Sequence, residues 1–396
     1  MQDGILEKVY ADLLSWCRQR DFAGQDPFDG LNSRLFQASP FRNSRTARLL
    51  WTQFFKRSPI DFRSTAQVPQ QRNAKGIALF ALASLARLRT KPTEEGDKET
   101  RKLLTDLISM RLTGFNGAAW GYNFDWQGRA FYAPRGTPTV VPTAFAARAL
   151  IEAAELLDGH EHSTDYLSFA RTICDFILND LNRTEDAADE VCFSYSPLDT
   201  TRVFNASLLA GEVLAVVGRL AKESSLCEWA KRTARYVVRR QRADGSWSYG
   251  GDDYQSWADN FHTAFILTSL SRIIRSCESA PDEFESALRR GYEYWHEQFF
   301  LANGWPKYFP GGAYPADVHA AGAALVALAE LRGQIPGTLL LADKIAHWTT
   351  ENLYNRSGYF YYQRRRFYTI RIPYMRWSEA WMAYGLARLI EAKHSS

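Results

Sequence analysis

The sequence contains few cysteines, no long apolar run and no large block of like charge. Its five cysteines, Cys17, Cys174, Cys192, Cys227 and Cys277, are scattered through 396 residues without a CxxC pair. We therefore expect free thiols in a reducing compartment rather than disulfides. No apolar run reaches the roughly 18 residues of a membrane helix, and the N-terminus lacks a basic stretch followed by an apolar one. These absences predict a soluble, cytoplasmic protein without a membrane span.

The charge balance and the ligand spacing exclude two further classes. The chain has 48 basic and 44 acidic residues, a net charge of +4, and its longest basic block is Arg364 to Arg366. Such a mild balance does not predict nucleic-acid binding. Asp317 and His319 are too few ligands for a metal site, so we expect neither a metal nor a cofactor.

Aromatic residues, by contrast, are abundant and recur at regular intervals. They make up 14% of the chain, with 12 Trp, 19 Tyr and 24 Phe. Six times, a loop rich in aromatic residues is followed by a polar helix start and then an apolar helix. These helices are predicted to begin near Ala74, Thr143, Asn205, Thr263, Ala320 and Ser378. Each interval accommodates two helices of about 15 to 20 residues and two connections.

This repeat predicts an all-α fold, an (α/α)6 toroid with two concentric rings of helices. Segment 320–330 is apolar nearly all round, as a buried inner helix should be, and segment 228–240 has one charged face, which is typical of an outer helix. An open superhelix of hairpins would give a similar pattern. We favour closure because six units match a ring and neither end has a polar capping repeat.

We expect a single domain over 1–396. It would consist of an N-terminal helix and loop over 1–42 and six hairpins over 43–392, the first formed by helices over 44–56 and 74–89.

In a toroid the outer-to-inner loops share one face, where the N-termini of the inner helices converge. We therefore predict that these loops line a funnel with aromatic side chains, which suit sugar rings or isoprenoid chains. Any single aromatic residue fits a structural role equally well. The predicted substrate-binding residues of the loops are Trp120, Tyr122, Asp125, Trp126, Tyr195, Trp247, Trp305 and Trp377.

Polar residues also gather at the starts of the inner helices. Asp and Asn there are ordinary N-caps. His262 and His319 fall in first turns, where the helix dipole disfavours the charged imidazole and leaves a neutral base, although packing alone is the alternative for both. The candidate catalytic residues are His262, His319, Asp259, Asp317, Tyr308 and Glu379. The candidate cations for an acidic group are Arg63, Lys75, Arg371 and Arg376.

Two chemistries remain open for a saccharide substrate. With a uronic-acid glycan, the cations would neutralise the carboxylate while His262, His319 or Tyr308 moves the C5 proton, as in a lyase or an epimerase. With a neutral glycan, a carboxyl pair from Asp259, Asp317 and Glu379 would carry out hydrolysis.

One motif resembles a known family. Gln241-Arg-Ala-Asp-Gly-Ser-Trp247 matches the QxxDGxW repeat of terpene cyclases, and the paired-helix layout is similar to the toroid family that includes protein prenyltransferase β-subunits. The resemblance implies the fold. Two departures argue against the activity: Gly251-Asp-Asp-Tyr254 lacks the first carboxylate of the cyclase DxDD motif, and Asp317 is followed two residues on by His319, not by the zinc-binding Cys of prenyltransferases.

Four other blocks, 120–126, 259–263, 314–319 and 376–381, resemble an uncharacterised group that accompanies surface-polysaccharide synthesis genes. This similarity implies a carbohydrate-active enzyme of polysaccharide biosynthesis or modification, with a saccharide substrate and polysaccharide-synthesis proteins as partners. The alternatives are a terpenoid or prenyl-type enzyme, and a non-catalytic toroid that binds a glycan or a protein.

Overall fold

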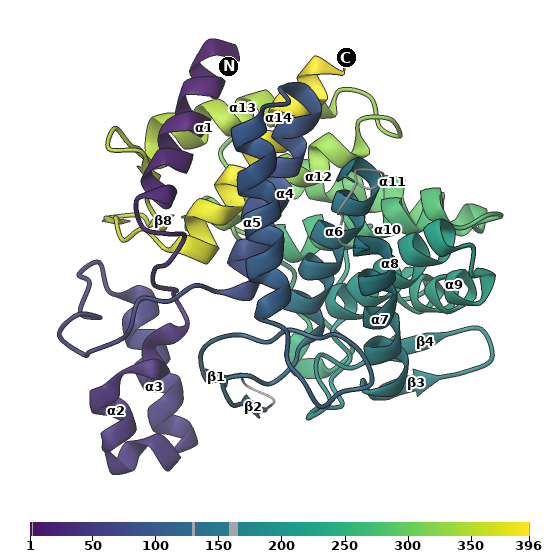
Figure 1. Ribbon diagram of the computed structural model, residues 1–396, viewed down its shortest axis with the longest axis horizontal. Helices are drawn as coiled ribbons and strands as arrows, with labels where there is room; N and C mark the ends of the chain where they lie inside the picture. Colours follow the sequence, from purple (N-terminus) through teal and green to yellow (C-terminus); the bar gives the residue numbers. More distant parts are fainter. Residues whose placement is uncertain (2, 129–130, 158–164, 396) are drawn as a thin grey trace.

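Six inner helices form a closed ring in the computed structural model, which describes residues 1, 3–128, 131–157 and 165–395. Each inner helix packs on the next, and the last packs on the first, so the ring is closed (Figure 1). The (α/α)6 toroid is thereby confirmed, and the open superhelix is excluded. The inner helices are α4 (Ala74–Thr90), α6 (Val140–Leu157), α8 (Phe204–Ala221), α10 (Asn260–Ser276), α12 (Val318–Leu331) and α14 (Ala380–His394).

The outer ring differs from the prediction at its first member. Helix α1 (Asp3–Arg18) packs on α14 and completes the outer ring. The helix predicted over 44–56 exists as α3 (Arg45–Arg57), but it packs mainly on two short helical turns, η1 (Asp29–Asn32) and η2 (Pro40–Asn43). The other outer helices are α5 (Glu94–Ser109), α7 (Tyr166–Asn179), α9 (Ser224–Val238), α11 (Asp282–Phe299) and α13 (Thr338–Leu353).

The widths of the apolar faces of α1 and α3 explain why α1, and not α3, belongs to the outer ring. Helix α1 buries six residues, including Leu6, Val9 and Leu13, whereas α3 buries only Thr52 and Phe55. A narrow apolar face cannot cover an inner helix. Helix α3, α2 (Arg34–Ala38), η1 and η2 therefore form a separate N-terminal lobe, residues 26–63, which projects from one end of the ring (Figure 1).

Small residues bring two inner helices close together. A Cβ on Gly322 of α12 would lie 2.7 Å from the carbonyl oxygen of Trp381, and one on Gly385 of α14 would lie 2.7 Å from the carbonyl oxygen of Gly322. Glycine is required at both positions because the two backbones are nearly in contact. This close approach holds the first turns of α12 and α14 side by side.

Buried ion pairs join the inner helices from their midpoints toward their C-terminal ends. Nε of Arg148 on α6 donates to Oε1 of Glu212 on α8 at 2.6 Å, and both side chains are 2% exposed. Arg272 on α10 lies 3.2 Å from Glu212 and 2.9 Å from Glu330 on α12. Arg272 also lies near the C-terminal, negative end of α10, where a cation is favourable.

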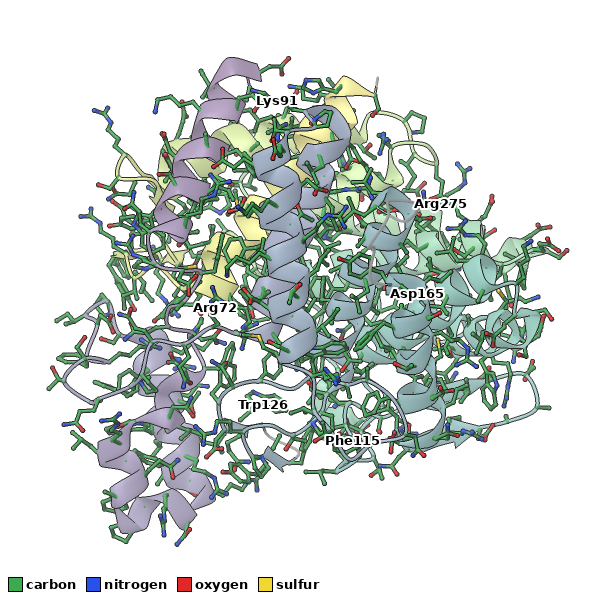
Figure 2. All side chains as sticks on the ribbon, viewed as in Figure 1. Arg72, Lys91, Phe115, Trp126, Asp165 and Arg275 are labelled. Atoms are coloured by element: carbon green, nitrogen blue, oxygen red, sulfur yellow. The ribbon has the colours of Figure 1, made fainter. Side chains whose placement is uncertain are left out.

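The loops gather at the opposite end, where the inner helices begin. Figure 2 shows Trp126 among these loops and Lys91 and Arg275 at the other end of the ring. Short antiparallel strands order the loops. They are β1 (Trp126–Gln127) with β2 (Tyr132–Ala133), β3 (Arg183–Asp186) with β4 (Val191–Phe193), β6 (Tyr354–Asn355) with β7 (Tyr359–Phe360), and β8 (Gln363–Arg364) between β5 (Ala316–Asp317) and β9 (Thr369–Ile370).

Helix α8 is the one helix of the described residues that is long and apolar enough to cross a membrane. It is 83% buried inside the protein, because it is a member of the inner ring.

Candidate functional site

His319 is a buried imidazole without a polar partner. It is the second residue of α12 and 1% exposed, and its ring centroid lies 4.6 Å from Phe261, 4.1 Å from Trp377 and 4.8 Å from Trp381. Neither ring nitrogen has a hydrogen-bond partner among the described residues. Burial, reinforced by the positive charges of neighbouring side chains such as Lys75, holds the pKa of His319 well below its usual range. The imidazole is therefore neutral and has a lone pair available.

His262 is oriented by a carboxylate. It lies in the first turn of α10, where Oδ1 of Asp259 accepts its backbone N–H at 2.9 Å and Oδ2 lies 2.9 Å from its Nδ1. A carboxylate at Nδ1 fixes the proton there in the neutral ring and leaves Nε2 as the free nitrogen. The ring lies 4.0 Å from that of Phe261, which also contacts His319. The two predicted histidines therefore share one site.

Asp317 holds this site together through three hydrogen bonds. Its Oδ1 accepts the backbone N–H of His319 at 2.9 Å and Nε1 of Trp377 at 3.0 Å, and its Oδ2 accepts Nε2 of Gln363 at 2.9 Å. Strand β8 brings Gln363 opposite Asp317 in register. Burial raises the pKa of Asp317 to about 6. The sequence predicted Asp259 and Asp317 as N-caps. Asp259 also orients the ring of His262, and Asp317 also orients the ring of Trp377.

Lys75 contributes a buried amine beside the same rings. It is 2% exposed, and its Nζ lies 5.3 Å from the ring of Phe265 and 5.2 Å from that of Trp381, both of which also contact His319. Within the described ranges, no carboxylate lies at ion-pair distance from its amine. Burial and the charge of Arg376 hold the pKa of Lys75 well below its usual range. An unpaired amine among aromatic rings is a site for an anionic group.

The N-terminal lobe supplies a residue that sequence reasoning missed. Lys56 of α3 places Nζ 4.5 Å from the ring of Phe28, which lies 5.2 Å from that of Trp377. Burial lowers the pKa of Lys56, and the nearby charges of Asp317 and Asp259 act in the opposite direction. The lobe thus covers the site beside Trp377. The predicted open funnel is closed there by Lys56 and Phe28. Nothing local distinguishes Lys56 from an ordinary surface lysine of an amphipathic helix.

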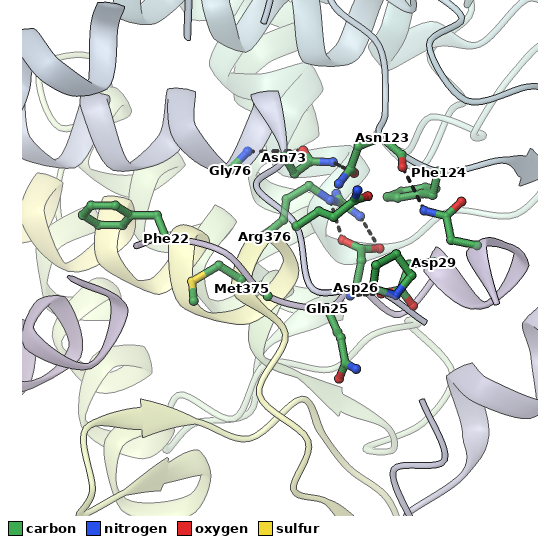
Figure 3. Close-up of a pocket in the computed structure, with 14 residues that line it drawn as sticks. Phe22, Gln25, Asp26, Asp29, Asn73, Gly76, Asn123, Phe124, Met375 and Arg376 are labelled. Atoms are coloured by element: carbon green, nitrogen blue, oxygen red, sulfur yellow. Dashed lines mark hydrogen bonds and ion pairs between the residues drawn. The ribbon is translucent and has the colours of Figure 1, made fainter. Parts of the chain in front are cut away.

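Two of the predicted cations anchor the lobe. Arg376 donates from Nε and Nη2 to the carboxylate of Asp26 at 2.6 and 2.8 Å, and Arg63 donates to Asp29 at 2.8 Å. All four side chains are buried. The cavity in Figure 3 lies beside the pair of Arg376 and Asp26, and its volume of about 10 Å³ is room for one water and no sugar.

Stacked aromatic pairs surround His262 and Arg376. Tyr249 and Trp257 stack at 4.4 Å, and both contact the His262 ring. Of the predicted residues, Trp126 stacks on Tyr195 at 5.6 Å, and Tyr122 lies 5.1 Å from the guanidinium of Arg376. Tyr308 contacts Phe261 at 5.8 Å, and burial raises its pKa well above the usual range, so its phenol stays protonated.

Three tryptophans that were predicted to stack on a substrate pack against the outer helices in the structure. Trp120 and Trp247 are at most 1% exposed, and their Nε1 atoms donate to the carbonyl oxygens of Leu107 at 2.8 Å and Val237 at 2.9 Å. Trp305 packs on an outer helix, 4.7 Å from the ring of Trp348. Each therefore fills the space beside the outer helices. The QxxDGxW segment follows α9 and contacts α11, where Nε2 of Gln241 donates to the carbonyl oxygen of Ala287 at 2.9 Å.

Three further candidates also lie away from the histidines. Glu379 is fully buried and accepts the backbone N–H of Phe360 at 2.9 Å, and burial raises its pKa well above its usual range. Arg371 is exposed and lies on the ring of Tyr361. Asp125 accepts from the hydroxyl of Tyr132 at 2.8 Å and from the backbone N–H of Arg135 at 2.7 Å. None of the three contacts the site.

Replacing Trp247 by alanine is expected to destabilise the fold, because the ring fills the space against Gly291, where a Cβ would lie 2.2 Å from it. The expected loss is about 3 to 5 kcal/mol of unfolding free energy in chemical denaturation. Trp257→Ala is the matched control, since that ring is only partly buried. Equal losses in both variants would contradict the structural position of Trp247.

Comparison with known proteins gives the fold but no family. No family model matches the sequence, and no curated protein matches it. Among solved structures, the chain is similar to cellobiose 2-epimerase from Bacillus thermoamylovorans, with a TM-score of 0.63, 12% identity, and coverage of 83% of this chain and 90% of that one.

It is also similar to a D-mannose isomerase, with a TM-score of 0.60, 11% identity, and coverage of 81% of this chain and 87% of that one. A third similar structure is the GH76 α-mannanase from Bacteroides thetaiotaomicron, with a TM-score of 0.61, 11% identity, and coverage of 83% of this chain and 89% of that one. At these identities the likeness shows the fold alone. The neighbours are named for sugars, whereas the sequence motif resembles terpene cyclases.

Proposed function

We propose that the protein is a carbohydrate-active enzyme that moves a carbon-bound proton of a sugar, as an epimerase, an isomerase or a lyase does. The observation that carries this proposal is the pair of imidazoles on Phe261, one neutral and unpaired, the other held by a carboxylate at Nδ1. The similarity to cellobiose 2-epimerase and D-mannose isomerase supports the same class of reaction.

The two imidazoles take complementary parts. His319, neutral and without a partner, removes the proton next to a carbonyl or carboxylate of the sugar, which leaves an enolate and an imidazolium. In this step His262 begins as the imidazolium, protonated on both ring nitrogens beside the Asp259 carboxylate, and it becomes neutral when it delivers its Nε2 proton to the enolate. Return of a proton to the same carbon gives an epimer, and return to its neighbour gives an isomer. Loss of a leaving group from the enolate gives a lyase product.

The cations indicate where negative charge develops. Lys75 and Lys56 approach the site from two sides, and neither has a carboxylate at ion-pair distance in the described part of the chain. Such amines stabilise an enolate or a uronate carboxylate in a site that excludes water. The stacked pair of Tyr249 and Trp257 offers the flat face that a sugar ring covers.

The geometry disfavours the hydrolytic alternative. Hydrolysis needs two available carboxyl groups on either side of the glycosidic bond. Both oxygens of Asp317 already accept hydrogen bonds, Asp259 holds His262, and Glu379 lies elsewhere. Proton transfer by imidazole uses nitrogens that remain available, namely those of His319 and Nε2 of His262.

The test is solvent exchange. We expect deuterium from D2O to enter C2 of a reducing sugar or C5 of a uronic-acid oligosaccharide, followed by NMR and mass spectrometry. Absence of exchange and of new products with a broad panel would contradict the proposal. Turnover of farnesyl diphosphate would favour the terpenoid alternative, and a thermal shift with sugar but no turnover would favour a non-catalytic toroid.

Lys75→Met is expected to separate activity from stability. It removes a buried amine whose charged form the apolar surroundings disfavour, so we expect a fall in kcat/KM of about 10²- to 10³-fold together with a higher melting temperature at pH 7.

The sign of the pH dependence follows from linkage. Because the folded-state pKa of Lys75 is lowered, the unfolded chain binds more protons near neutrality, and the stability of the wild type rises with pH toward 10. The melting-temperature gap between Lys75→Met and the wild type should therefore narrow from pH 7 to 9. A lower melting temperature for Lys75→Met at pH 7 would contradict a destabilising amine.

A further inference from the structure

For its length, the N-terminal lobe exposes more large apolar side chains than the ring does. Leu50 is 67% exposed, Phe41 63% and Ile60 61%, and the adjoining loop carries Phe367 at 86%. The hydroxyl of Tyr368 in that loop donates to the carbonyl oxygen of Arg57, so loop and lobe meet. Half of the exposed large apolar residues of the described chain lie in these two segments. They are Leu35, Phe41, Leu50, Phe54, Ile60, Phe62, Phe367 and Tyr368.

Part of this set is continuous. Leu50 and Phe54 lie one turn apart on the outer face of α3, and the ring of Phe54 stacks on that of Phe62 at 5.5 Å. We call Leu50, Phe54, Ile60, Phe62 and Phe367 the lobe patch. The inner face of α3 already supplies the buried residues, so packing within the lobe does not require the outer ones.

The lobe patch is surrounded by positive charge. Residues 30–62 contain six basic residues and a single acidic residue, a net charge of +5 in a chain whose total is +4. Arg57 and Arg366 are exposed beside the patch, and Arg42 is exposed at the end of η2. The lobe projects from the ring, so patch and charges reach beyond the rest of the molecule (Figure 1). An apolar surface flanked by arginines is complementary to a membrane surface, which offers acyl chains to the apolar side chains and anionic headgroups to the arginines.

We propose that the lobe patch binds an anionic membrane surface, with its apolar side chains in the headgroup boundary and its arginines on the phosphates. Docking uses the outer face of α3, opposite to the face that presents Lys56 to the site. The proposal is independent of the reaction proposed above, because it rests on exposed residues alone.

Vesicle flotation tests this binding. The full chain is mixed with vesicles of phosphatidylcholine alone, or with phosphatidylglycerol added, at low and high salt. We expect binding to the anionic vesicles only, weakened by salt. Leu50→Gln with Phe54→Gln, and separately Arg57→Glu with Arg366→Glu, should each reduce the bound fraction about ten-fold. Because these side chains are exposed, the melting temperature should stay near that of the wild type.

The matched control replaces exposed leucines on the ring. Leu198→Gln with Leu340→Gln removes side chains that are 60% and 72% exposed and should leave binding unchanged. The proposal is overturned if the wild type fails to float with anionic vesicles, or if the control loses as much binding. Binding to polyglutamate without vesicle binding would point to an acidic protein instead. Patch-dependent dimers in sedimentation without vesicle binding would point to a second copy of the chain.

Discussion

Replacing His319 by phenylalanine should remove turnover while leaving the fold intact. Phenylalanine keeps an aromatic ring among Phe261, Trp377 and Trp381, and it removes two ring nitrogens that have no hydrogen-bond partner within the described residues. No polar group loses a partner, so we expect a melting temperature equal to or above that of the wild type. Loss of a general base predicts a fall in kcat/KM of about 10²- to 10⁴-fold, measured as deuterium exchange into the sugar.

Two controls separate chemistry from packing at His319. His262→Gln should lower turnover to a similar degree, because it removes the second proton-transfer group. Asp259→Asn keeps the N-cap oxygen for the backbone N–H of His262 and removes the carboxylate that orients its ring, so it should lower turnover without a comparable loss of stability. Persistent exchange in His319→Phe would refute the two-imidazole proposal. A large loss of stability would identify His319 as a structural residue.

Glu212→Ala should destabilise the fold about as much as Trp247→Ala. The substitution leaves Arg148, which is 2% exposed, without its carboxylate in the interior of the ring. Removing one partner of a buried ion pair costs about 3 to 5 kcal/mol, because the remaining charge stays desolvated. Urea denaturation at pH 7 measures this loss. Arg148→Met combined with Glu212→Leu should recover most of it, since both charges are then absent.

The same network predicts the acid behaviour of the protein. Neighbouring arginines lower the pKa of Glu212 and lower that of Glu152 to about 2, against the cost of burial. A depressed carboxylate pKa stabilises the fold above the unfolded value of about 4.3 and loses this contribution as the pH falls toward 2. Stability should therefore fall from pH 5 to pH 3, and less steeply in the double variant. A pH dependence unchanged by that double substitution would contradict this account.

Periodicity was sufficient to predict the ring, and local patterns predicted part of the site. The six apolar helices and the first-turn positions of His262 and His319 depend on short-range rules, namely helical period, capping and loop placement. These rules also predicted Asp259 and Asp317 as caps. They could not distinguish an aromatic residue that lines a site from one that packs between helices, because Trp247 and Trp257 differ only in what surrounds them.

Tertiary packing decided the remainder. The choice of α1 over α3 as the sixth outer helix depended on the width of each apolar face, relative to an inner helix far away in sequence. Lys56 lies near enough to Asp317 and Asp259 for their charges to act on its amine only because the lobe packs against the loops at this end of the ring. A sequence pattern determines what a segment can bury, since that is a property of its own side chains. Which surface buries it, and which charges then meet, depends on contacts between segments hundreds of residues apart.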